Sequence, residues 1–234
     1  KMQKLKENVD SSIAAADTER GVFILLTGNG KGKSSSAFGM VMRALGYGYK
    51  VGVVQFIKGA QLSGEELYVR DHCPQVTFQQ MGTGFTWDTQ DRSADIAAAE
   101  KSWAVAEKML SDKSYHLVVL DELTYMLSFK YLDEDVVLNA LRNHPTNQSV
   151  VVTGRGGGSG LADWADTVSE IKEIKHAYNS GVMARKGTRF AIKGWKMRGI
   201  YRPDGGLDTR NGNVSESTTV EQGGGEEYGE EDED

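Results

Sequence analysis

Apolar residues are grouped along the chain in short, uninterrupted runs. Four runs are rich in β-branched residues and lie at 22–27, 51–57, 116–122 and 149–154. Because polar residues do not alternate within them, the runs are typical of strands buried on both faces of a parallel sheet. Segments 76–81 and 167–174 show the same character more weakly and are further strand candidates.

Between these runs the apolar positions recur every three or four residues. This spacing predicts helices at 33–45, 93–110 and 133–141. Strands that alternate with helices predict an α/β fold, with a mostly parallel, doubly wound sheet between two helical layers. Ligands of such sheets bind beyond the carboxyl ends of the strands, so we expect the functional site at the ends of the four runs.

The N-terminal segment has a different pattern. Within residues 1–20 the apolar side chains fall on one helical face, at Met2, Leu5, Val9, Ile13 and Ala16. An amphipathic helix of this kind needs a surface to cover, whether the domain itself, a partner subunit or a bound ligand.

Length and charge divide the chain into three parts. A chain of 234 residues suits one well-buried domain, which we place at 21–190, after the helix at 1–20. From Val214 onward there are nine acidic residues and no Lys or Arg, so the net charge of -6 leaves the preceding residues slightly basic. We expect the C-terminal extension, 191–234, to be disordered from about residue 203, because it has little apolar surface to bury.

Composition also limits the class of protein. The single cysteine, Cys73, excludes an intramolecular disulfide and a multi-cysteine metal cluster. No apolar run is long enough for a membrane span, and the N-terminus has no signal-peptide core, so we expect a soluble, cytoplasmic protein with no membrane partner. The weak positive charge of the core argues against a nucleic-acid partner.

The first run is followed by TGNGKGKSSS, residues 27–36. Its Gly32-Lys33-Ser34 matches the end of the phosphate loop G-x-x-x-x-G-K-[ST], and Thr27 replaces the first glycine. In this pattern the glycines let backbone N–H groups approach phosphate oxygens, the lysine bridges phosphates, and the serine hydroxyl binds Mg²⁺. We therefore expect a nucleotide here, with a glycine-rich structural turn as the alternative.

The third run ends in two acids, Asp121 and Glu122, in LVVLDE. Beside a phosphate loop such acids hold Mg²⁺ directly or through water, although they can also cap the following helix. At this point it stays open whether the protein cleaves the phosphate chain of the nucleotide or acts on the other end of the molecule. The sequence lacks the N-K-x-D element of a guanine-specific GTPase, and arginines are too sparse to suggest a kinase lid.

The stretch MGTGFTWDTQD, 81–91, places Phe85 and Trp87 two residues apart in a polar segment. Composition alone allows either local packing or a ligand pocket. Together with TGNGKGKSS, VGVVQFIKG, VVLDELTY, VVTGRG and ADTVSEIKEIKHAY, the element GFTWDTQ resembles the ATP:corrinoid adenosyltransferases of the cobalamin pathway. The resemblance runs in order from Arg20 to Gly187 and implies a P-loop NTPase fold of the RecA-like type.

The resemblance implies that a Co(I) corrinoid attacks the 5′ carbon of ATP and that triphosphate leaves. Lys33 would then neutralise the leaving group, while Phe85 and Trp87 would fill the space beneath the corrin ring and exclude water. Mg²⁺, or Mn²⁺ in its place, would be held by Ser34, Asp121 and Glu122. The implied nucleotide contacts are Thr27, Gly28, Asn29, Gly30, Lys31, Gly32, Lys33, Ser34, Ser35, Arg43 and Arg155.

Other implications are weaker. A surface salt bridge is an equal alternative for Arg43 and for Arg155. The resemblance also implies a homodimer, an N-terminal helix that folds over the active site, and an electron-donating flavoprotein partner. Cobalamin, cobinamide and an a,c-diamide remain open as the corrinoid. The rival hypotheses are another P-loop kinase or ATPase acting on a small molecule, and a non-catalytic carrier of nucleotide or corrinoid.

The chain departs from the family pattern in two places. Ser34 and Ser35 replace the more common threonines, which keeps the hydroxyl groups. Relatives generally end soon after an element that corresponds to Gly187–Phe190 and often have an acid at the position of Arg189. The present chain continues through 191–234, a segment to which the sequence assigns no function.

Overall fold

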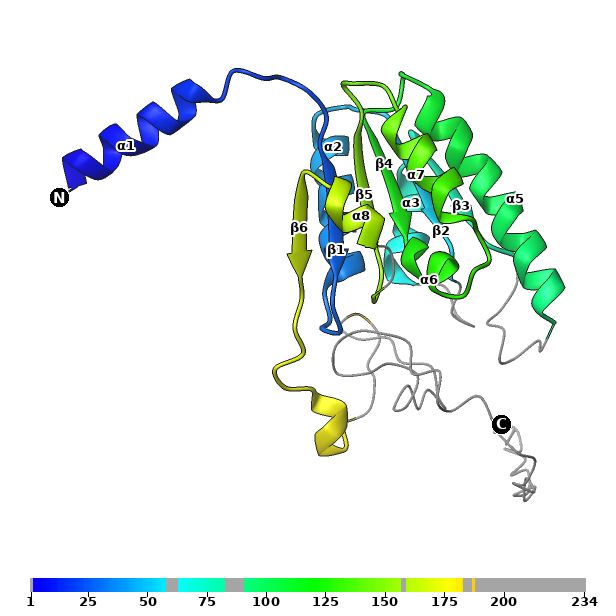
Figure 1. The fold of residues 1–234 in the computed structure, drawn as a ribbon. Helices are drawn as coiled ribbons and strands as arrows, with labels where there is room; N and C mark the ends of the chain where they lie inside the picture. The colour runs from blue at the N-terminus through cyan, green and yellow to red at the C-terminus, as the bar shows by residue number, and fades with distance from the viewer. Residues whose placement is uncertain (1, 58–62, 83–90, 157–158, 183–186, 188–234) are drawn as a thin grey trace, which may run out of the picture.

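The computed structural model describes residues 2–57, 63–82, 91–156, 159–182 and 187 (Figure 1). Within them, six strands form one all-parallel sheet in the order β3-β2-β4-β5-β1-β6. The strands are β1 (Phe23–Thr27), β2 (Val51–Gln55), β3 (Val76–Gln80), β4 (Leu117–Asp121), β5 (Ser149–Thr153) and β6 (Thr167–Glu170). All six strand predictions are confirmed, including the two weaker ones.

Helices connect the strands on both faces of the sheet. They are α1 (Met2–Ala15), α2 (Lys33–Gly46), α3 (Gly64–His72), α5 (Arg92–Ser111), α6 (Leu123–Ser128), α7 (Glu134–Arg142) and α8 (Ser159–Trp164), with a 3₁₀ turn, η1, at Ala177–Ser180. The predicted helices at 33–45, 93–110 and 133–141 correspond to α2, α5 and α7. Side-chain caps from Asp91 and Asp133 set where α5 and α7 begin. No helix among the described residues is both long and apolar enough to cross a membrane.

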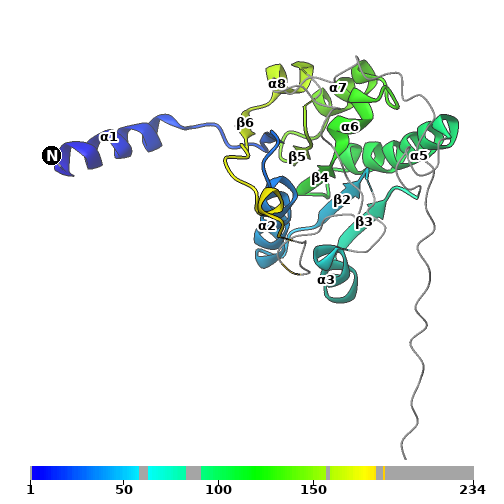
Figure 2. The ribbon, with the colours of Figure 1, turned by 90° about the horizontal axis from the view of Figure 1, so that it is seen from below.

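Helices lie on both faces of the sheet (Figure 2), and the sheet divides the core into two apolar layers. Phe23 and Leu25 of β1 pack with residues of α5, α6 and α7 on one face. Leu26 of the same strand packs with α2 and α3 on the other face, where Cys73 is also buried. Successive residues of one strand thus enter opposite layers, which explains why the strand sequences are apolar without alternation. The predicted three-layer α/β sandwich is confirmed.

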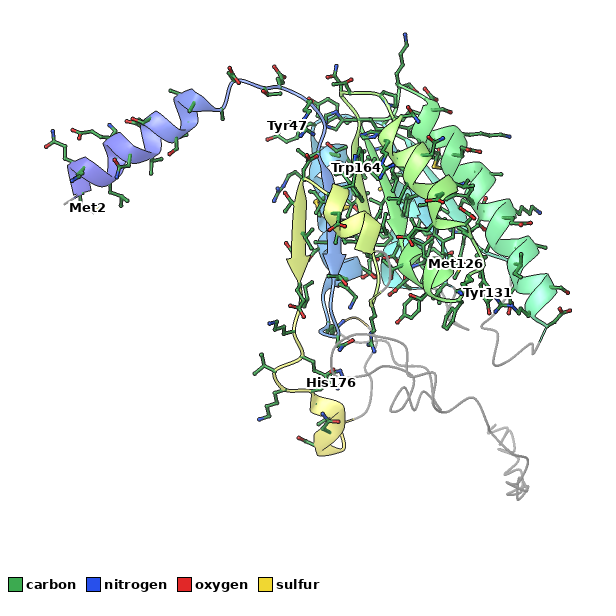
Figure 3. All side chains as sticks on the ribbon, in the orientation of Figure 1. Met2, Tyr47, Met126, Tyr131, Trp164 and His176 are labelled. Carbon is green, nitrogen blue, oxygen red and sulfur yellow. The ribbon has the colours of Figure 1, made fainter. Side chains whose placement is uncertain are left out.

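The predicted N-terminal helix is present as α1, but it projects away from the sheet (Figure 1). No residue of α1 is buried, and its apolar side chains are exposed, as Met2 shows in Figure 3. In this structure α1 therefore does not cover the carboxyl edge of the sheet. That it folds over the active site stays a prediction. The C-terminal extension, 191–234, lies outside the described residues.

The chain that leads from α1 into the sheet is fixed at Arg20. Its guanidinium donates hydrogen bonds to both carboxylate oxygens of Asp166, at 2.8 and 2.6 Å. The backbone N–H of Phe23 donates to the same carboxylate at 2.8 Å. The hydrogen bond from Arg20 is the main reason that the pKa of Asp166 falls to about 2. Asp166 lies just before β6, so this pair links the start of β1 to the edge of the sheet.

Candidate functional site

The glycine- and lysine-rich segment forms the turn between β1 and α2 at the carboxyl edge of the sheet. Gly28 and Gly32 have φ values of 95° and 129°, in the region that favours glycine. Lys33, the first residue of α2, is buried and folds back over its own loop. Its ammonium donates to the carbonyl of Gly28 at 2.8 Å and to that of Gly30 at 2.9 Å. The lysine is thus held inside the concavity of the loop.

A segment that follows β6 lies against this loop. The N–H of Ile171 donates to the carbonyl of Thr27 at 2.8 Å, and the N–H of Gly30 donates to the carbonyl of Ile171 at 2.6 Å. The sequence predicts a weak strand at 167–174 but assigns Ile171 no role. The two backbone bonds extend the β1–β6 pairing into the loop and fix its path.

Replacing Gly28 with alanine is expected to distort the loop. A Cβ atom at this position would lie 2.4 Å from the carbonyl oxygen of Ile171, and the positive φ adds backbone strain. We expect the variant to lose about 2 kcal/mol of stability and to bind ATP at least tenfold more weakly. Thermal unfolding and calorimetric ATP titration measure the two effects. Gly39→Ala is the matched control, because a Cβ there meets nothing within 4 Å.

The two acids lie at the end of β4 and have different environments. Asp121 is 1% exposed, and its Oδ1 and Oδ2 accept hydrogen bonds from Thr153 Oγ1 at 2.7 Å and Gln55 Nε2 at 2.9 Å. Glu122 has a φ of 60°, and its backbone N–H donates to Thr153 Oγ1 at 2.9 Å. Glu122 precedes α6, yet its side chain makes no capping hydrogen bond. Helix capping therefore does not explain the pair.

The acids and the loop lysine form one electrostatic group. Burial, followed by the charge of Asp121, raises the pKa of Glu122 to about 7, while Lys33 and Arg155 act in the opposite direction. Burial lowers the pKa of Lys33, and the two acids oppose that shift. Oε2 of Glu122 is buried and has no hydrogen-bond partner among the described residues. Such an atom is suited to a cation.

The raised pKa of Glu122 has a measurable consequence for stability. Between about pH 4.5 and pH 7 the folded protein holds a proton on Glu122 that the unfolded chain releases, so the free energy of unfolding falls as the pH rises. Wild type should therefore lose on the order of 3 kcal/mol relative to Glu122→Gln across this window, and no more above it. Chemical denaturation of both proteins without metal or nucleotide measures the difference, and a constant difference would contradict the shift.

The other predicted nucleotide contacts lie at opposite edges of the sheet, most of them at the carboxyl edge and Arg43 at the amino edge. Arg155 follows β5, is half-buried, and is close enough to affect the pKa of both Lys33 and Glu122. The remaining loop residues of the prediction, Asn29, Lys31, Ser34 and Ser35, surround the turn, and Ser34 is half-buried in the first turn of α2. The structure thus brings Arg155 to the phosphate loop together with the acids.

Arg43 is not brought to this site. It lies in the last turn of α2, ten residues and about 15 Å from Lys33 along the helix. Because α2 runs back from the carboxyl edge of the sheet, Arg43 lies at the amino edge. There it lines a hollow of 330 Å³ together with Tyr47 and Tyr49 (Tyr47 is labelled in Figure 3). That Arg43 contacts the nucleotide phosphates stays a prediction.

Phe85 and Trp87 lie outside the described residues. The nearest described residues on either side of them are Gly82, which follows β3, and Asp91, which caps α5. The corrinoid role of the two aromatic residues stays a prediction.

The predicted metal ligands fit Mg²⁺ by their chemistry. Ser34, Asp121 and Glu122 offer only oxygen atoms, which Mg²⁺ prefers, and the buried Oε2 of Glu122 lacks a partner within the described chain. The described residues contain no group of three or more His, Cys, Asp or Glu side chains arranged to hold a metal ion. Mg²⁺ is usually bound by one or two carboxylates together with substrate phosphates, so this donor set suits a metal that arrives with a nucleotide.

A parallel sheet with a glycine–lysine loop after β1 and paired acids at the end of β4 defines a P-loop nucleotide-binding protein. Comparison with protein families gives the particular kind. Residues 19–190 match the family model ATP:corrinoid adenosyltransferase BtuR/CobO/CobP. The chain therefore belongs to the ATP:corrinoid adenosyltransferase family.

Individual relatives agree with the family match. The chain is 54% identical to a corrinoid adenosyltransferase of Pseudomonas aeruginosa, over 81% of this chain and 94% of the relative. It is 50% identical to the Escherichia coli K12 enzyme and 49% identical to corrinoid adenosyltransferase CobA of Salmonella typhimurium LT2, each over 80% of this chain and 94% of the relative. The resemblance inferred from the motifs is confirmed, and the chain is an enzyme whose substrates are ATP and a corrinoid. A kinase, another ATPase and a carrier are not favoured.

Proposed function

We propose that the enzyme transfers the 5′-deoxyadenosyl group of ATP to the Co(I) centre of a reduced corrinoid, in the biosynthesis or salvage of adenosylcobalamin. The cobalt electron pair forms a bond to C5′, the bond between C5′ and its oxygen breaks, and triphosphate leaves with that electron pair. Cobalt is thereby formally oxidised from Co(I) to Co(III). The observation that supports this proposal most directly is Lys33, held inside a phosphate loop in a chain of this family.

We assign different residues to the triphosphate of ATP and to the corrinoid that reacts at C5′. Co(I) is a strong nucleophile, so the reaction needs no general base, and catalysis consists of positioning and of charge neutralisation at the triphosphate. We assign Lys33 and the loop N–H groups to the triphosphate. We assign Ser34, Asp121 and Glu122 to Mg²⁺, which would neutralise further charge on the leaving group. Phe85 and Trp87 are proposed to cover the lower face of the corrin ring and exclude the water ligand of Co(II).

The proposal extends to the partners of the enzyme. An electron-donating flavoprotein would supply the reduction to Co(I), and we place the reaction in the cytoplasm, where ATP is available. We also propose a homodimer in which α1 leaves its exposed position and folds over a nucleotide site. The exposed apolar face of α1 supports this part of the proposal, because Leu5, Val9 and Ile13 need a surface to cover.

One anaerobic assay tests the reaction. The enzyme is mixed with ATP, Mg²⁺ and chemically generated Co(I) cobalamin, and the visible spectrum and the phosphate products are followed. We expect a cobalt–carbon product and one triphosphate for each turnover. Release of ADP or of single phosphate would favour a kinase or an ATPase, and binding without turnover would favour a carrier.

A further inference from the structure

A row of polar side chains crosses the carboxyl edge of the sheet and ends at Asp121. Gln55 Nε2 donates to Asp121 Oδ2 at 2.9 Å, and Gln80 Nε2 donates to Gln55 Oε1 at 2.9 Å. Gln80 Nε2 also donates to Glu66 Oε2 at 3.0 Å, and Glu66 Oε1 pairs with Arg70 at 2.8 Å. The row therefore connects β4, β2, β3 and α3.

Strand register produces this alignment. Asp121 is the last residue of β4, and it is paired in register with Gln55, the last residue of β2. Gln55 is in turn paired with Gln80, the last residue of β3. Residues directly opposite one another on neighbouring strands place their side chains on the same face, so three consecutive strands present this row to one side of the sheet.

The hydrogen bonds fix the direction of each amide. Because Glu66 and Gln55 Oε1 are both acceptors, Gln80 must direct its NH₂ group toward them. Gln55 Oε1 is then held by Gln80, and its NH₂ group must face Asp121. If the amide of Gln55 were reversed, its oxygen would face a carboxylate oxygen, which is repulsive. The orientation at Asp121 is thus set by a residue two strands away.

Glu66 supplies the fixed end of the row. It lies in the first turn of α3, where Ser63 accepts a hydrogen bond from its backbone N–H at 3.1 Å, and it is 0% exposed. Burial of a carboxylate is costly unless it is paired and hydrogen-bonded. An apolar residue would pack the same space without that cost. Packing alone therefore does not explain why Glu66 occupies this position.

We propose that Gln55 and Gln80, anchored by Glu66, are positioning residues that hold the Asp121 carboxylate for the metal–triphosphate site. Two donors, Gln55 and Thr153, fix the rotation of the Asp121 carboxylate, and each of its oxygens keeps a further lone pair that could bind a cation. Partners of this kind orient carboxylate ligands, and their loss typically weakens metal binding by about 10–100-fold. The inference rests on the proposed role of Asp121 in holding Mg²⁺.

Gln80→Met tests the inference, with Gln79→Met as the matched control. Gln79 is in register with Val54, so it lies on the opposite face of the sheet, and its side chain donates to the carbonyl of Gln80 rather than to the polar row. We expect Gln80→Met to raise the Mg²⁺ concentration for half-maximal turnover about tenfold, with kcat at saturating Mg²⁺ within about twofold of wild type. Mn²⁺ binding to the enzyme–ATP complex, followed by electron paramagnetic resonance, should weaken by a similar factor. Gln79→Met should change neither.

Gln80→Glu keeps the size of the side chain and provides a second test. It replaces the two donated hydrogen bonds with acceptors, so the Gln55 amide must turn its oxygen toward Asp121. The added negative charge would by itself attract Mg²⁺ more strongly. Weaker Mg²⁺ and Mn²⁺ binding in this variant would therefore come from the lost orientation, and tighter or unchanged binding would contradict the inference.

The outcomes separate this inference from the proposed metal site. If Asp121→Asn weakens Mn²⁺ binding while Gln80→Met behaves as Gln79→Met does, Asp121 holds the metal and the positioning role is wrong. Loss of kcat and of thermal stability in Gln80→Met, with the Mg²⁺ dependence unchanged, would show a purely structural role and also overturn it. If Asp121→Asn leaves Mn²⁺ binding unchanged, the proposed metal site fails, and the inference fails with it.

Discussion

Lys33→Ala is expected to lower kcat/KM for ATP by at least about a thousandfold. Lys33 is the first residue of α2, and its ammonium already lies within the phosphate loop, bonded to the carbonyls of Gly28 and Gly30. In the proposed reaction the Lys33 ammonium leaves these carbonyls and contacts the triphosphate, whose negative charge grows as the bond to C5′ breaks. Triphosphate release with Co(I) supplied chemically measures the effect.

Lys172→Ala is the control for this prediction. Lys172 follows Ile171, which contacts the loop, but its side chain is exposed and pairs with Glu170 at 3.4 Å. The substitution removes the same charge from the same region, and we expect the activity to stay within about threefold of wild type. Equal losses in the two variants would show that net charge near the loop, rather than Lys33 itself, supports the reaction.

Trp87→Ala is expected to have its main effect when the enzyme must work from Co(II). Removal of the large apolar side chain would let water reach the lower face of the corrinoid, and a four-coordinate Co(II) that is easy to reduce would no longer form. We expect a loss of at least about a hundredfold in an assay that starts from Co(II) and a reductase. The loss should be within about tenfold when Co(I) is supplied ready-made.

Trp87→Phe is the companion variant, because it keeps an aromatic side chain at the same position. It should retain most of the activity that starts from Co(II). Electron paramagnetic resonance of the enzyme with ATP and Co(II) corrinoid reports the loss of the axial ligand directly. An equal loss in both assays for Trp87→Ala would contradict the role proposed for this residue.

The sequence predicted the sheet well because burial on both faces gives each strand a recognisable local sequence pattern. Each strand is an unbroken apolar run, since alternate residues enter the two helical layers, as Leu25 and Leu26 do. The phosphate loop and the acids after β4 were likewise recognisable, because their chemistry depends on a few residues at fixed spacing. Short helices such as α3 and α6 were not predicted, since nine and six residues show little periodicity.

The contacts of the site that join distant segments were not predictable in this way. The bond between Gly30 and Ile171, and the row from Asp121 to Glu66, depend on strand order and register, which no local pattern records. Gln55 and Thr153 were expected near the site only because they end strands, and Gln80 was not singled out. That α2 carries Arg43 to the opposite edge of the sheet was likewise not evident from the motifs, and its contact with the nucleotide stays a prediction.

The bond between Arg20 and Asp166 makes α1 a tethered arm with a fixed hinge. From Arg20 the five residues back to Ala15 can span about 17 Å when extended, and the 14-residue helix adds about 21 Å. The hinge at Arg20 lies eight residues before Gly28, at most about 27 Å along an extended chain. The arm can therefore reach the nucleotide without release of the hinge. Because the tether keeps it at an effective concentration on the order of millimolar, even a weak apolar contact would be enough to hold it closed.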